Sequence, residues 1–203
     1  MPAILHHECR TVQNLVGMEK SEMNITDRVK MANAYKDHIK KMKNSAWNGS
    51  MFELHKNLSP KAKGAWGERL TCDILESYGA KVPRDKKGKN KKPKGAGSDY
   101  DVWINDKKIE VKTSFAWDEE PDKFVWQQIR NQDYEYIVFI GVNPGECKAW
   151  WATKEDIVNN IFGKDKYRQH GGNSGEQDLY WIQATMFDGN VPGWFKPIKD
   201  WGK

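Results

Sequence analysis

The sequence predicts a mixed α/β fold, in which a central mixed β-sheet is flanked by helices and preceded by a helical N-terminal extension. Helical and strand-like patterns follow one another in the order helix, strands, helix, strand, which is typical of this class. Apolar residues make up 38% of the 203 residues and include ten tryptophans, so the chain can bury the core of one domain. It contains no apolar run of about 18 residues, and we expect no membrane-spanning helix.

Residues 1–55 are predicted to form the helical extension and residues 56–203 the main domain. Within the extension, the segment TDRVKMANAYKDHIKKM repeats apolar residues at helical spacing and becomes basic toward its end. The first residues, MPAILHHECR, lack a basic stretch followed by an apolar run, so we expect no secretory signal. Three cysteines are spread over the chain without CxxC spacing, which indicates a reducing compartment and no structural zinc site.

A second helix is predicted to start after Ser59. Ser59 can cap it, Pro60 suits its first position, and Gly79 can end it. The apolar residues of one row along this helix are Ala65, Cys72 and Leu75. Glu68 lies on the same row, and a charged group on a buried face needs a partner or a function, unless it reaches water at the helix edge.

Residues 81–94, KVPRDKKGKNKKPK, form a strongly basic loop. They include seven lysines, one arginine and one aspartate, a net charge of +7, whereas the whole chain carries +5. Nucleic acid is the partner that such a cluster favours, because each neutralised phosphate releases counterions. A solvated loop that only aids solubility is the alternative.

Farther along, the pattern predicts a hairpin, a helix and a last strand. The hairpin strands are expected at residues 136–142 and 147–152 around the turn NPGE, and the helix after Thr153. The segment LYWIQATMF is predicted to be a strand, and the tail that follows it irregular.

The segment GSDYDVWINDKKIEVKTSF, residues 97–115, is predicted to form two short strands around a turn at residues 105–106. In that register Asp101 faces Glu110, and directly opposed residues share a face of the sheet. One face carries the apolar side chains of Val102, Ile109 and Val111. The other face carries Asp99, Asp101, Glu110 and Lys112, with Asp99 opposite Lys112.

Two opposed carboxylates repel each other, and a hard divalent cation between them removes that cost. Lys112 would lie beside such a cation and beside a phosphate bound to it. These groups together can hydrolyse a phosphodiester, because the cation activates water and the lysine stabilises charge or orients that water. The simpler interpretation is a solvated sheet face on which Lys112 forms a salt bridge with Asp99 or Glu110.

The acid-x-Lys triplet alone carries little information. It occurs at residues 85–87, 106–108, 110–112 and 146–148. Only the third of these triplets combines an alternating apolar strand, an opposed aspartate and an adjoining basic loop.

The hairpin resembles the signature of the PD-(D/E)xK nuclease superfamily, which has an aspartate at the start of one strand and ExK on the next. Asp101, Glu110 and Lys112 match those positions, although Tyr100 stands where the signature has proline. Many members also carry a glutamate on the helix before the sheet, and Glu68 fits that position.

The resemblance, to type II restriction-endonuclease-like DNA endonucleases, covers roughly residues 60–185 and implies a restriction-endonuclease-like core. It implies a Mg²⁺ ion, for which Mn²⁺ can substitute. The implied metal ligands are Asp101, Glu110 and the backbone carbonyl of Val111. By the same resemblance Lys112 assists the attacking water, and Glu68 supports that water or the metal.

The resemblance implies further roles at other positions. Asp99 stays open as an alternative to Asp101 for the primary metal ligand. Gln127 or Gln128, in a glutamine-rich turn, would contact the catalytic region. The implied DNA contacts are the loop lysines Lys86, Lys87, Lys89, Lys91, Lys92 and Lys94, and the tryptophans Trp117 and Trp126 where these are not core residues.

The implied function is a Mg²⁺-dependent DNA endonuclease, sequence-specific and restriction-like, that acts on double-stranded DNA in the cytoplasm of a bacterial or phage-like system. A structure-specific nuclease of the junction-resolvase, repair or homing type is one alternative. A non-catalytic nucleic-acid-binding module on the same fold is another. With one active site per chain, cutting both strands implies a homodimer or two successive nicks.

Overall fold

The computed structural model describes residues 25–43, 45–168, 179–185 and 191–202. The chain divides into two compact units, residues 1–45 and 46–203. In the first unit, helix α2 (Ile25–Lys43) agrees with the predicted helix. Its described side chains, those of residues 29–37 and 40, are all exposed.

Residues 46–55, which the sequence analysis groups with the N-terminal extension, lie in the second unit. Trp47 is 2% exposed and its ring lies 5.9 Å from that of Phe115. The short helix α3 (Glu53–Lys56) follows, and the ring of Phe52 contacts that of Trp66. This segment therefore contributes aromatic side chains to the core of the second unit.

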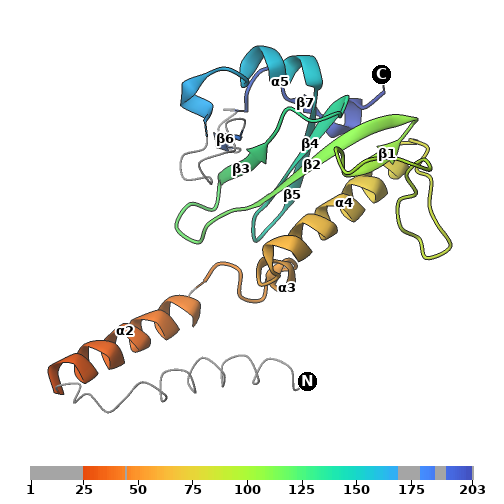
Figure 1. The fold of residues 1–203 in the computed structure, drawn as a ribbon. Helices are drawn as coiled ribbons and strands as arrows, with labels where there is room; N and C mark the ends of the chain where they lie inside the picture. Colours follow the sequence, from red (N-terminus) through yellow and green to blue (C-terminus); the bar gives the residue numbers. More distant parts are fainter. Residues whose placement is uncertain (1–24, 44, 169–178, 186–190, 203) are drawn as a thin grey trace. The chain divides into compact units, whose positions relative to one another are not determined.

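The second unit has a mixed α/β fold around a mixed five-stranded sheet, which confirms the predicted class (Figure 1). Its strands, in their order across the sheet, are β1 (Val102–Ile104), β2 (Lys107–Phe115), β4 (Tyr136–Val142), β5 (Cys147–Thr153) and β7 (Lys196–Pro197). Only β2 and β4 are parallel. The remaining strands, β3 (Lys123–Ile129) and β6 (Tyr180–Thr185), form a separate antiparallel pair.

The β1–β2 hairpin has the predicted register, with Val102 opposite Ile109. Asn105 and Asp106 both have positive φ, 52° and 57°, as a two-residue type I′ turn requires. Asn105 also ties this turn to the segment after α4, because its Oδ1 accepts from the Lys81 N–H at 2.6 Å. The apolar face is buried as predicted.

Helix α4 (Pro60–Ser77) begins and ends as the sequence predicts. The Ser59 hydroxyl accepts from the Ala62 N–H at 3.3 Å, and Pro60 occupies the first helical position. Gly79 follows with φ 88°, and the Ala80 N–H donates to the Leu75 carbonyl, which closes the last turn.

α4 packs against one face of β2 at Gly67, and Figure 1 shows it running along the sheet. A Cβ at Gly67 would lie 1.9 Å from Thr113 Oγ1 and 3.1 Å from Thr113 Cβ. Only glycine allows the helix to approach this closely, and that approach brings Glu68 to the sheet.

The opposite face of the sheet is covered by the β3–β6 pair. Ser114 Oγ accepts from the Val125 N–H at 3.0 Å, and the Phe124 ring lies against Gly141. Trp126 is 1% exposed and donates from Nε1 to the Ile140 carbonyl, so it is a core residue and not a DNA contact. Residues 123–129 form a strand, whereas the resemblance implies a glutamine-rich turn there.

The remaining elements follow the prediction except at the C-terminus. β4 and β5 pair around the predicted turn, and Thr153 caps helix α5 (Lys154–Asn160) in a capping box with Asp156. The tail, predicted to be irregular, contributes β7 to the sheet edge and a 3₁₀ turn, Ile198–Asp200. None of the helices in the described ranges is long and apolar enough to cross a membrane.

We predict that Gly67→Ala destabilises the protein by about 1–3 kcal/mol, because the new methyl group overlaps the β-branched Thr113 side chain. Gly64→Ala is the matched control on the same helix: a Cβ there meets no atom within 4 Å. That variant should gain about 0.5–1 kcal/mol from helix propensity. Urea unfolding of both variants measures the difference, and equal effects would contradict the proposed contact.

Candidate active site at the open edge of β2

The candidate site lies where β1 ends and leaves the edge of β2 open. Pairing of β1 stops at Val102, so the next backbone groups of β2 lack a strand partner. The Asp101 N–H donates to the Ile109 carbonyl at 3.0 Å, and Asp101 Oδ2 accepts from the Val111 N–H at 2.8 Å. The N–H and C=O groups of one residue in a strand point toward the same neighbouring strand. The Val111 carbonyl therefore also points to this edge.

Glu110 lies next to Asp101 and is almost fully buried. It is 6% exposed, and its Oε1 lies 2.7 Å from Lys112 Nζ. Burial raises the pKa of the Glu110 carboxyl; Lys112 opposes that rise, and the charge and hydrogen bond of Asp101 add to it. The structure thus places the two carboxylates together, and the lysine neutralises only one of them.

Tyr134 and Lys154 are further neighbours of Glu110 that the sequence analysis missed. Tyr134 is 3% exposed, and its hydroxyl has no hydrogen-bond partner in the described ranges. Burial and the charge of Glu110 raise the pKa of this phenol. Lys154 Nζ lies 4.0 Å from the Tyr134 ring centroid. Neither residue belongs to a motif, and the pairing of β4 with β2 and with β5 brings them near Glu110.

Glu68 reaches the site from α4. It lines a cavity of about 390 Å³ together with Asp101 and Lys92. Burial, reinforced by the charge of Asp101, raises the pKa of Glu68 to about 7, although Lys92 acts in the opposite direction. The acid on the apolar row therefore lies beside the hairpin acids, where a proton or a cation would relieve the repulsion.

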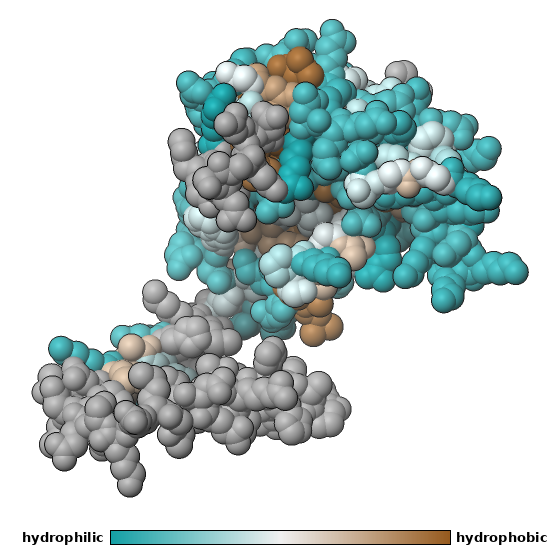
Figure 2. All heavy atoms as spheres, in the orientation of Figure 1, coloured by the Kyte–Doolittle hydropathy of each residue, from teal (hydrophilic) through white to brown (hydrophobic). Residues whose placement is uncertain are grey.

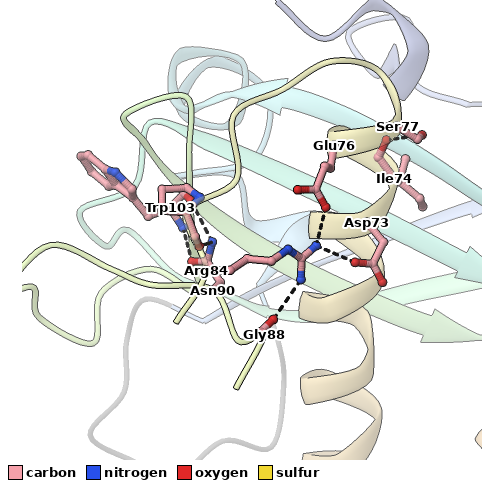
Figure 3. A network of polar contacts seen from close by, with 9 residues as sticks. Asp73, Ile74, Glu76, Ser77, Arg84, Gly88, Asn90 and Trp103 are labelled. Carbon is pink, nitrogen blue, oxygen red and sulfur yellow. Dashed lines mark hydrogen bonds and ion pairs between the residues drawn. The ribbon is translucent and has the colours of Figure 1, made fainter. Parts of the chain in front are cut away.

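The basic loop is an ordered structure, and Figure 3 shows the contacts that hold it. Arg84 lies 2.6 Å from Asp73 and 2.8 Å from Glu76 on α4, and it donates to the Gly88 carbonyl at 3.0 Å. On the other side of the loop, Asn90 binds the backbone of β1.

Asn90 replaces a strand partner for Trp103. Its Oδ1 accepts from the Trp103 N–H at 2.8 Å and its Nδ2 donates to the Trp103 carbonyl at 2.9 Å. The loop is thereby fixed to both α4 and β1. The side of the unit that carries it is mostly hydrophilic on the face shown in Figure 2.

The six loop lysines do not all face the site. Lys89 and Lys92 line the cavity beside Glu68 and Asp101. Lys92 also donates to the Tyr100 carbonyl, and its Nζ lies 4.5 Å from the Tyr100 ring centroid. The other four, Lys86, Lys87, Lys91 and Lys94, are exposed.

Three further residues implied by the resemblance are exposed. Asp99 is exposed and lines a separate hollow with Lys94 and Lys108, and the strand pairing that would set it opposite Lys112 does not extend to it. Gln127 and Gln128 are exposed on β3, at a β-bulge where Gln128 has φ 55°.

The donors at the β2 edge suit a hard divalent cation. They are two carboxylates and one backbone carbonyl, and Mg²⁺ is commonly held by one or two carboxylates while it keeps several waters. No group of three or more His, Cys, Asp or Glu side chains in the described ranges is placed to hold a metal. The carbonyl of Val111 and water would therefore complete the coordination.

In comparisons with known proteins, no family model, curated protein or solved structure matches this chain.

We predict that Glu68→Gln stabilises the protein by about 1–2 kcal/mol at about pH 8. The pKa of Glu68 is about 7 in the folded protein against an ordinary 4.5, so the folded state binds its proton more tightly. The contribution of the Glu68 carboxyl to the free energy of unfolding is fully present below about pH 4.5, and it is lost as the pH rises through 7. The advantage of the variant should thus vanish toward low pH.

Urea unfolding at several pH values measures this difference, with the same substitution at exposed Glu119 as a control for net charge. A variant that is less stable than the wild type at about pH 8 would show that the Glu68 charge is favourable in the fold.

Proposed function

We propose that the protein is a Mg²⁺-dependent DNA endonuclease with a PD-(D/E)xK active site on a restriction-endonuclease-like core. The observation that carries the proposal is the meeting of Asp101 and Glu110 at an open strand edge, with Lys112 beside them. The residues Asp101, Glu110 and the carbonyl of Val111 would hold the cation. When bound, the cation would stabilise charge on the phosphate and lower the pKa of the attacking water.

The protein's own side chains supply the remaining chemistry. The side chain of Lys112 is 18% exposed, and its ammonium group beside Glu110 can stabilise charge or orient the water. Glu68, with a pKa of about 7, can accept a proton from that water near neutral pH. Glu68 shares its cavity with Asp101, and Lys112 pairs with Glu110, so each of these groups lies next to one of the two carboxylates.

A purely structural role for the Glu110–Lys112 ion pair explains the arrangement of Asp101, Glu110 and Lys112 less well than an active site does. The chain contains such a pair at the start of β5, where Lys148 Nζ lies 3.0 Å from Oε1 of Glu146 in the preceding turn. That pair is half exposed and is placed near a turn. The Glu110–Lys112 pair is mostly buried, and a second carboxylate, that of Asp101, lies beside it. A purely structural ion pair would not require this second carboxylate, which repels Glu110.

DNA is the proposed substrate, because the ordered basic loop adjoins the acids. Sequence-specific cutting of double-stranded DNA, by a homodimer or through two nicks, is the form that the resemblance favours. A structure-specific nuclease would use the same groups on junctions or flaps.

We predict that purified protein cleaves long DNA in the presence of Mg²⁺ or Mn²⁺, and that Lys112→Ala lowers the rate by at least about 10²-fold. Lys148→Ala is the matched control, because it removes the lysine of the other Glu-x-Lys strand pair and should leave the rate unchanged. Sequencing of the DNA ends measures activity, specificity and cut geometry together.

Cuts at fixed sites mean that the enzyme reads sequence, and cuts confined to junctions or flaps mean that it reads structure. Salt-dependent DNA binding without cleavage of any duplex, junction or single strand would contradict the proposal and favour a non-catalytic binding module.

We also predict that Mg²⁺ raises the melting temperature of the wild-type protein, since a ligand of the native state stabilises it by mass action. Asp101→Asn should abolish the rise, and Asp99→Asn, the matched control in the neighbouring hollow, should retain it. Thermal unfolding with and without Mg²⁺ tests this without any measurement of activity. The reverse pattern would assign the metal to Asp99.

A further inference from the structure

The cavity beside Glu68 is lined by more cationic than acidic side chains. It lies between α4 and the basic loop, has a volume of about 390 Å³, and is lined by four cationic side chains, Arg69, Arg84, Lys89 and Lys92. Among the residues that the structure describes, two acids, Glu68 and Asp101, line it.

The four cations have different partners. Arg84 is held by Asp73 and Glu76, so its charge is compensated within the protein. No ion pair joins Arg69 or Lys89 to a carboxylate within the described part of the chain. Arg69 lines the cavity from α4, and Lys89 lines it from the loop.

We propose that this cavity is a phosphate pocket in which Arg69, Lys89 and Lys92 bind a backbone phosphate of DNA next to the one that is cleaved. The inference rests on the proposed nuclease function, since Asp101 belongs to both the pocket lining and the metal-binding set. A phosphate in the pocket would place the adjoining phosphodiester at the edge of β2.

The pocket is formed before any ligand arrives. The contacts of Arg84 with α4 and of Asn90 with Trp103 fix the loop on both sides, and Lys92 is held by the Tyr100 carbonyl. A preformed cationic wall loses little conformational entropy on binding, which favours a localised phosphate contact over diffuse attraction.

This assignment divides the loop lysines into two groups. Lys89 and Lys92 line the pocket, whereas Lys86 and Lys87 lie in the exposed turn around Gly88. The outer lysines attract DNA at a distance, and their removal one at a time should change affinity little.

The test compares Arg69→Met and Lys89→Met with the control Lys87→Met, all at exposed positions, where a substitution is expected to leave the fold intact. Binding of a short mixed-sequence duplex is measured with Ca²⁺ in place of Mg²⁺ over a range of salt concentrations. Arg69→Met and Lys89→Met should each weaken binding about tenfold and lower the salt slope by about 0.9, as loss of one phosphate contact requires. Lys87→Met should change the affinity less than about twofold.

Inorganic phosphate is the second probe. It should raise the melting temperature of the wild-type protein and of Lys87→Met, and raise that of Arg69→Met less. If the wild type cleaves DNA but all three variants bind duplex and phosphate equally, the pocket is wrong and the nuclease stands. If Arg69→Met and Lys89→Met lose binding while the wild type never cleaves, the pocket stands and the nuclease is wrong.

Discussion

The hydrogen bond from the Val111 N–H to the Asp101 carboxylate, 2.8 Å long, is the contact on which the candidate site depends. β1 is only three residues long, and beyond Val102 it leaves the edge of β2 without a partner. A buried N–H needs an acceptor, and here a side-chain carboxylate provides it. That bond holds Asp101 beside Glu110 and directs the Val111 carbonyl to the same edge.

The surrounding structure holds the site in an electrostatically unfavourable state. Burial and neighbouring acids raise the pKa values of both Glu68 and Glu110, while Lys92 opposes the rise at Glu68 and Lys112 opposes it at Glu110. Such groups cost stability unless a proton or a cation binds, and groups of this kind concentrate at functional sites. The close packing of Gly67 on Thr113 maintains Glu68 in this position, and the fixed basic loop closes the other side.

The sequence predicted the elements in which local signals agree with the tertiary fold. The hairpin register followed from an alternating apolar face and a two-residue turn, and α4 followed from its cap, its first-turn proline and its final glycine. The strand β3 was not recognised, because its pairing with β6 and its burial against Gly141 are contacts distant in sequence. The β7 strand was missed for the same reason, since Trp151 and the tail meet only in the folded chain.

The sequence by itself determined the acids and the lysine of the hairpin, the register that makes Asp101 face Glu110, and the charge of the loop. Each of these depends on neighbours within one element or one turn. Only the tertiary structure decided that Asp99 lies apart from Lys112, because strand pairing ends at Val102 and Asp99 lines a separate hollow. It also brought Tyr134 and Arg69 to the site, since strand pairing and helix packing join segments that no local pattern connects.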